Sequence, residues 1–147
     1  MSRPVVDKRT RWQKIKDFFF KTYDETEKFS EKDIDSSAFF APISYLGILF
    51  FVPLLIKPNS AFAKYHANQG LVLLLTELAV NVVICLMVIV LNLVNFWIFP
   101  TFLFTAFLFT FCNLFFVIFI ILGAYNATSG YAKEIPLIGR WRIIKAL

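Results

Sequence analysis

A single carboxylate lies in the longest apolar part of the chain. Residues 65–132 contain one formally charged side chain, Glu77. A carboxylate within a membrane span is costly and is by default a functional candidate, as a proton carrier or as part of a substrate path. Asn81 follows four positions later, so on a helix it shares the face of Glu77. The structural alternative is a Glu77 that is protonated, or paired with Lys64 or Lys133 reaching in from the membrane surface.

A second set of polar residues directly precedes this apolar stretch. His66, Asn68, Gln69 and Gly70 form, with Glu77 and Asn81, a candidate functional or structural polar cluster. His66 is the one histidine of the sequence, and it has no Cys or carboxylate companions at metal-ligand spacing. This pattern favours structural hydrogen bonding over metal binding or catalysis. We therefore expect no catalytic residues, no metal and no cofactor.

The elements that position these residues are set by the membrane. Hydrophobic residues make up 59% of the chain and charged residues 17%, and a membrane-spanning helix needs about 20 apolar residues. The sequence predicts an all-α integral membrane protein with a membrane domain over 39–126. Its three apolar helical segments are expected at about 39–56, 71–91 and 102–123. The first contains two prolines and is short, so it can cross steeply or enter and return as a re-entrant segment.

Amphipathic interfacial helices are expected to flank these segments. In the polar tail 1–38, a basic helix would carry Trp12, Ile15, Phe19 and Tyr23 at three- and four-residue spacing. Such a helix can lie in the headgroup plane, or remain in water and dock a partner. A short interfacial helix is expected over about 60–69, with Ser60 as its N-cap. The basic C-terminal tail 127–147 predicts another, with Ile138, Trp141 and Ile144 on its apolar side.

Loop charge predicts the orientation. The turn 92–101 has no Lys or Arg and should lie outside, which places the basic C-terminal tail in the cytoplasm. The N-terminal tail is also rich in Lys and Arg, so it belongs on the same side only if segment 39–56 does not cross. We predict a multi-pass protein of the cell membrane, bacterial inner membrane by type, with both tails cytoplasmic.

Two sequence elements carry a family resemblance. One runs from Ser60 through Phe62-Ala63-Lys64-Tyr65-His66-Ala67-Asn68-Gln69-Gly70 to Leu71, and the other is Pro136-Leu137-Ile138-Gly139. Over about residues 38–142 the chain resembles small bacterial membrane proteins related to the chloroplast inner-envelope import subunit Tic-twenty, and the magnetosome membrane protein MamF is similar. The resemblance implies a polytopic helical protein without known catalysis. For plastid relatives it implies a protein-conducting complex, and for magnetosome relatives a role in organelle membrane organisation.

Three functions are compatible with these features. The first is a non-enzymatic structural or complex-forming subunit of a membrane assembly, with lipid and a membrane-protein partner or a second copy as its contacts. The second is a translocon or transporter subunit in which Glu77 and Asn81 line a path. The third, an intramembrane enzyme, needs a second acid or base, and His66 is its candidate. We predict the first, with no enzyme activity and no nucleic-acid partner.

Overall fold

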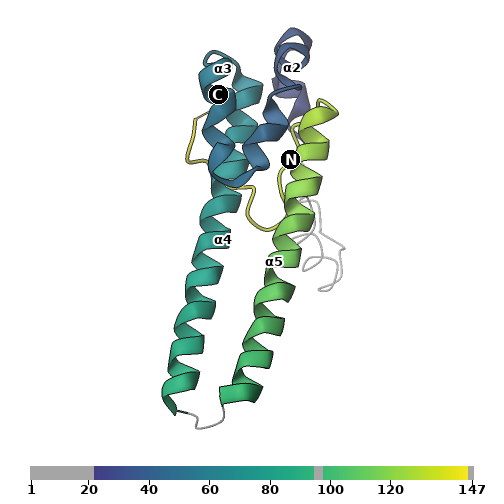
Figure 1. The fold of residues 1–147 in the computed structure, drawn as a ribbon. Helices are drawn as coiled ribbons and strands as arrows, with labels where there is room; N and C mark the ends of the chain where they lie inside the picture. The colour runs from purple at the N-terminus through teal and green to yellow at the C-terminus, as the bar shows by residue number, and fades with distance from the viewer. Residues whose placement is uncertain (1–21, 95–97, 146–147) are drawn as a thin grey trace, which may run out of the picture.

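The computed structural model describes residues 22–94 and 98–145, and a hairpin of two long helices dominates it (Figure 1). Helix α4 spans Ala61–Val94 and helix α5 spans Ile98–Thr128. Both are long and apolar enough to cross a membrane. At 1.5 Å per residue they extend about 51 and 46 Å, well beyond a hydrocarbon core of about 30 Å.

The apolar surface of the hairpin faces outward. In the most apolar windows of α4 and α5, only 17% and 11% of the residues are buried inside the molecule. The core helix of a water-soluble protein would instead be mostly buried, so this exposure favours lipid as the surrounding medium. An all-helical fold with two membrane-length helices is therefore confirmed.

The first apolar segment does not form a helix of spanning length. It breaks into two 3₁₀ helices, η2 (Ala41–Tyr45) and η3 (Gly47–Phe51), followed by the short helix α3 (Val52–Ile56). Gly47, the first residue of η3, has a positive φ of 58°, a conformation that glycine adopts without strain. Helix α2 (Glu31–Ser37), which precedes the segment, and α3, which ends it, lie at the same end of the hairpin (Figure 1). A short 3₁₀ helix, η1 (Thr26–Lys28), comes before α2.

Helix α4 begins where the sequence predicts, but it continues without a break. The Ser60 hydroxyl accepts a hydrogen bond from the Ala63 N–H at 2.9 Å, and the Asp33 carboxylate accepts one from the Phe62 N–H at 2.9 Å. These bonds satisfy N–H groups that have no partner within the helix. The expectation of a separate interfacial helix over 60–69 is wrong, because these residues form the first turns of α4 itself.

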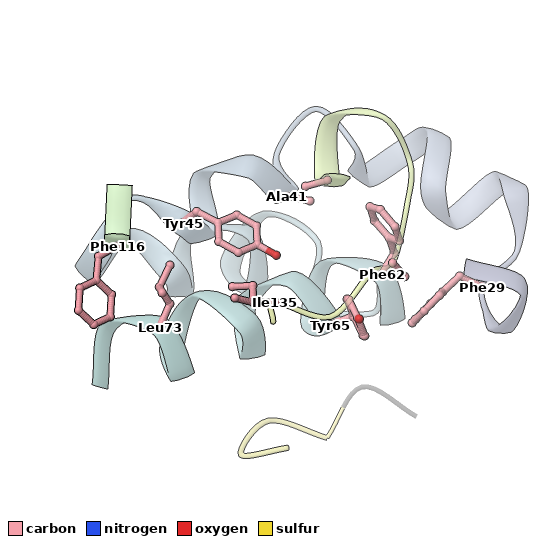
Figure 2. Close-up of a cluster of buried hydrophobic side chains, with 10 residues drawn as sticks. Phe29, Ala41, Tyr45, Phe62, Tyr65, Leu73, Phe116 and Ile135 are labelled. Carbon is pink, nitrogen blue, oxygen red and sulfur yellow. The ribbon is translucent and has the colours of Figure 1, made fainter. Parts of the chain in front are cut away.

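A buried cluster joins the short helices, Phe29 and the segment at Ala132 and Ile135 to the hairpin (Figure 2). Tyr45 of η2 is 1% exposed and packs with Leu73 of α4 and Phe116 of α5. Two glycines permit this close approach. A Cβ on Gly70 would lie 1.8 Å from the Ser44 carbonyl oxygen, and a Cβ on Gly123 would lie 2.3 Å from the Tyr45 ring. Segment 41–45 is therefore seated against both long helices.

Replacement of Gly70 by alanine should destabilise this packing. Alanine normally favours a helix over glycine, but here its Cβ would overlap a backbone oxygen that cannot rotate away. We expect a net loss of about 1–3 kcal/mol, the usual cost of overpacking. A lower thermal unfolding midpoint of the detergent-solubilised protein would show it. Ala79→Leu, on an exposed part of the same helix, is the control, and an unchanged midpoint for Gly70→Ala would contradict the close contact.

Candidate functional site

The polar residues at the start of α4 are buried and lie beside a chain segment that is distant in sequence. His66 and Gln69 are fully buried, and Asn68 is 1% exposed. They pack against residues 131–145, an irregular segment after α5 that we call the C-terminal strap. In Figure 1 this segment runs along the hairpin and returns to the end at which α4 begins. The structure therefore brings three of the predicted cluster residues to one contact.

Asn68 holds the strap through its backbone. Its amide nitrogen donates to the Trp141 carbonyl at 2.6 Å. Its amide oxygen accepts from the N–H groups of Ile143 at 2.6 Å and Ile144 at 2.8 Å. One buried side chain thus supplies three hydrogen bonds that the irregular strap cannot make with itself.

Gln69 repeats this arrangement one residue further along α4. Its amide nitrogen donates to the Gly139 carbonyl at 2.8 Å, and its oxygen accepts from the Ile135 N–H at 3.3 Å. Gly139 has to be small, because a Cβ there would lie 2.7 Å from the Gln69 amide oxygen and 2.5 Å from the Ile135 nitrogen. Residues 136–140 form a turn, and its position depends on the Gln69 amide.

His66 makes its contacts with buried aromatic side chains in the interior of the fold. The Tyr45 hydroxyl lies 2.8 Å from His66 Nδ1, and the rings of Phe62, Tyr65 and Tyr45 surround the imidazole at centroid distances of 4.6–5.8 Å. A buried cation without a counter-ion is costly, so this environment favours the neutral imidazole. Within the part of the chain that the structure describes, no three His, Cys, Asp or Glu side chains gather to hold a metal ion.

A cluster of ion pairs, which the sequence did not predict, joins the strap to Glu25 and to another part of itself. One guanidinium nitrogen of Arg142 donates to Glu25 at 2.8 Å and to Glu134 at 2.9 Å, and the other donates to the Gly139 carbonyl at 3.1 Å. The guanidinium also lies 5.0 Å from the centroid of the Tyr65 ring. Arg142 and Glu25 are 117 positions apart, so no local spacing signals their contact.

The residues just before η1 attach to the other end of the strap. Asp24 and Lys133 form an antiparallel bridge, supported by a bond from the Glu25 N–H to the Ala132 carbonyl at 2.9 Å. The Thr26 hydroxyl and N–H donate to the Asp24 carboxylate, and these bonds, helped by nearby Lys133, lower the pKa of Asp24 below its usual value. Both ends of the described chain are therefore fastened together beside the start of α4.

Glu77 and Asn81 lie deeper in the hairpin and do not line an enclosed path in the described chain. The Asn81 amide nitrogen donates to the Glu77 backbone carbonyl at 2.9 Å, and its oxygen accepts from Asn113 of α5 at 3.2 Å. This amide pair links the two long helices. Glu77 is half-buried, and among residues 22–94 and 98–145 no ion pair joins it to Lys64 or Lys133. Two helices cannot by themselves surround a pore.

The first predicted interfacial helix, through Trp12, Ile15, Phe19 and Tyr23, is not found where the structure describes it. Trp12, Ile15 and Phe19 lie outside the described residues. Tyr23, the last member of that helix, lies in non-helical chain, where its carbonyl accepts from the Glu134 N–H at 3.1 Å, so a helix reaching Tyr23 is wrong.

The C-terminal helix is wrong as well. Ile138, Trp141 and Ile144 lie in turns and irregular chain. The reason is the competition for backbone groups: the amides of Asn68 and Gln69 take the N–H and carbonyl groups that a helix would pair internally.

These features define the class: an all-helical hairpin of membrane-spanning length, whose polar cluster fastens a strap and short helices to one end. The chain belongs to the MamF/MmsF family, described as the magnetosome magnetite crystal formation protein family, whose profile matches residues 35–144. The magnetosome half of the expected resemblance is thus confirmed, and the link to Tic-twenty stays a prediction.

Two relatives are the magnetosome proteins MamF of Paramagnetospirillum magneticum strain AMB-1 and Magnetospirillum gryphiswaldense strain MSR-1. Each is 58% identical to this chain over 33 residues, which cover 22% of the chain and 30% of the relative. The matched stretch is therefore less than a third of either relative. No solved structure matches the chain.

Removal of the Asn68 amide should free the strap. In Asn68→Ala, the backbone groups of Trp141, Ile143 and Ile144 lose their partners, and each such group costs about 1–3 kcal/mol if it stays buried. We expect several-fold faster amide hydrogen exchange across 135–145, because the strap opens to reach water. Asn92→Ala is the control, since among the described residues the Asn92 amide bonds the Val88 carbonyl of its own helix. Unchanged exchange in Asn68→Ala would contradict the role given to this side chain.

Proposed function

We propose that this protein is a non-enzymatic structural or complex-forming subunit of a magnetosome-type membrane assembly. The observation that carries the proposal is the use of the polar cluster: the amides of Asn68 and Gln69 and the Nδ1 of His66 are buried and engaged in holding the fold. The two amides engaged in this way have little capacity left to bind a substrate, and the other ring nitrogen of His66, Nε2, is buried away from solvent. Membership of the MamF/MmsF family supports magnetite crystal formation as the process served.

The surfaces that remain for interaction are apolar. Leu78 and Leu86 of α4 and Phe104 and Phe107 of α5 are all more than half exposed. In a bilayer, such faces contact acyl chains or the helices of a partner, and packing there requires no catalytic geometry. The hairpin is thus suited to act as a membrane-embedded binding element, and lipid, a partner protein or a second copy can occupy its faces.

We further infer that the first apolar segment enters the membrane and returns, so that both tails lie in the cytoplasm. The position of α2 and α3 at one end of the hairpin supports this topology (Figure 1). The bridge between Asp24 and Lys133 supports it as well, because it ties the N-terminal part to the strap. Lys and Arg in both tails agree with a cytoplasmic location.

Glu77→Gln distinguishes the proposed role from transport or catalysis. The substitution removes a charge and keeps the size, so an assembly role predicts unchanged copurification of partners after gentle detergent extraction. In a magnetite-forming bacterium that lacks its own family member, this variant should restore crystal size, measured by electron microscopy, as well as the wild-type chain does. Intact assembly with crystals that stay defective would instead support a path or proton carrier at Glu77. Gly70→Ala, which disturbs the fold, serves as the contrasting variant.

Cysteine labelling tests the topology. In a chain with Cys85→Ala and Cys112→Ala, we expect Ser36→Cys and Ser129→Cys to react with a membrane-impermeant maleimide from the cytoplasmic side. Asn92→Cys, near the far end of α4, should react only from the opposite side. Labelling of Ser36→Cys and Ser129→Cys from opposite sides would mean that the first segment crosses the membrane completely.

A further inference from the structure

The C-terminal strap is held at a defined depth relative to the apolar part of the hairpin. Asn68 and Gln69 bind its backbone at residues 135–144, and the mainly apolar part of α4 begins two residues after Gln69, at Leu71. The interval along the helix is only about 3–5 Å. The headgroup layer on each side of the hydrocarbon is about 5–8 Å thick. The strap therefore lies at headgroup level if the apolar run fills the hydrocarbon.

The strap presents large apolar side chains outward at this level. Trp141 is 68% exposed, Leu137 57% and Ile143 52%. A bilayer surrounds an embedded hairpin on all sides, so an exposed side chain at headgroup depth that points outward from the fold lies among lipid headgroups and interfacial water. Tryptophan favours this layer, since its ring is apolar and its N–H can bond to water or headgroups.

Leu137 has a backbone conformation that its side chain makes unfavourable. Its φ is 73°, and it is the one non-glycine residue with positive φ among residues 22–94 and 98–145. Glycine or asparagine would adopt this conformation at lower cost. An exposed leucine gains nothing from the interior of the fold, so the strain points to a role for this side chain outside the molecule.

The charge on the strap identifies the kind of surface. Arg140 and Lys145 are exposed on either side of Trp141 and Ile143, whereas the acidic Glu134 is buried and paired with Arg142. Basic side chains beside exposed apolar ones are the pattern of segments that bind anionic membrane surfaces.

We propose that the strap is a non-helical membrane-surface anchor, in which Leu137, Trp141 and Ile143 insert among anionic phospholipid headgroups while Arg140 and Lys145 contact their phosphates. The proposal rests on the membrane-embedded hairpin of the proposed function. Asn68 and Gln69 act as positioning residues, because they set the depth of the strap from one end of α4.

The test uses the full chain with Trp12→Phe and Trp97→Phe, so that Trp141 is the single tryptophan and can be excited selectively over the tyrosines, in nanodiscs of phosphatidylglycerol or phosphatidylcholine. Lipids brominated near the headgroup should quench Trp141 several-fold more than lipids brominated near the chain ends. Leu137→Gly, which relieves the backbone strain, should not lower the unfolding midpoint but should weaken the shallow quenching. Leu93→Ala, at a leucine near the far end of α4 that is even more exposed than Leu137, is the control and should change nothing. The shallow quenching should be stronger in phosphatidylglycerol than in phosphatidylcholine, and Arg140→Gln with Lys145→Gln should abolish this difference.

Three results would overturn the proposal. Trp141 that is quenched by aqueous iodide and not by bromolipid lies in water. Trp141 shielded from both quenchers is covered by protein, such as a second copy. Equal quenching in the two lipids removes the anionic headgroup from the proposal. Flotation of the reconstituted protein with vesicles is scored separately, because it tests membrane embedding, on which the proposed function also depends.

Discussion

Irregular backbone beside a membrane helix is tolerated only where its N–H and carbonyl groups find partners, because hydrocarbon offers none. This constraint explains the composition of the first three turns of α4. Asn68 and Gln69 supply five hydrogen bonds to the strap, and Asp33 and Ser60 satisfy N–H groups at the start of the helix. The polar residues of α4 before Leu71 therefore fix the positions of the strap and of the residues that precede the helix. Without it, the strap would have to form its own helix or remain in water.

The short 3₁₀ helices pack against the same turns of α4, and glycines determine how closely their backbone can approach the two long helices. Gly70 lies directly under the Ser44 carbonyl, while Gly123 makes room on α5 for the Tyr45 ring. The ring in turn brings its hydroxyl to His66. A glycine on each helix thus allows one segment to contact both, and the segment links α4 to α5 at this end much as the pair of Asn81 and Asn113 links them further along. Because α4 is continuous from Ala61 to Val94, these contacts are rigidly connected to the membrane-facing part.

Much of the fold could be predicted from local sequence, since the information was local. The nearly charge-free stretch from 65 to 132 gives the two long helices, and Ser60 gives the start of α4. The wrong predictions concern segments whose conformation depends on contacts with residues that are distant in sequence. The spacing of Ile138, Trp141 and Ile144 is helical, yet Asn68, more than 70 positions away, binds the backbone that a helix would need. The cluster at His66, Asn68 and Gln69 was recognised as polar and unusual, but its partners belong to the strap and to Tyr45, and a single sequence does not reveal such pairings.

Because the polar amides at the start of α4 are buried and bonded to backbone, the surfaces available for function lie elsewhere on the molecule. The hydrogen bonds that the buried amides of Asn68 and Gln69 make are all to backbone groups, and breaking them costs free energy. Such side chains are therefore poor sites for reversible binding. Glu77 keeps a carboxylate without an ion-pair partner among the described residues, but one group at one level of a two-helix hairpin cannot move a solute across a bilayer by itself. The exposed features are of another kind: apolar helix faces along the hairpin and a basic, aromatic strap at its end. On the function proposed above, a chain built in this way acts by what it contacts in and on the membrane, and the fixed relation between strap and hairpin sets the depth at which each proposed contact is made.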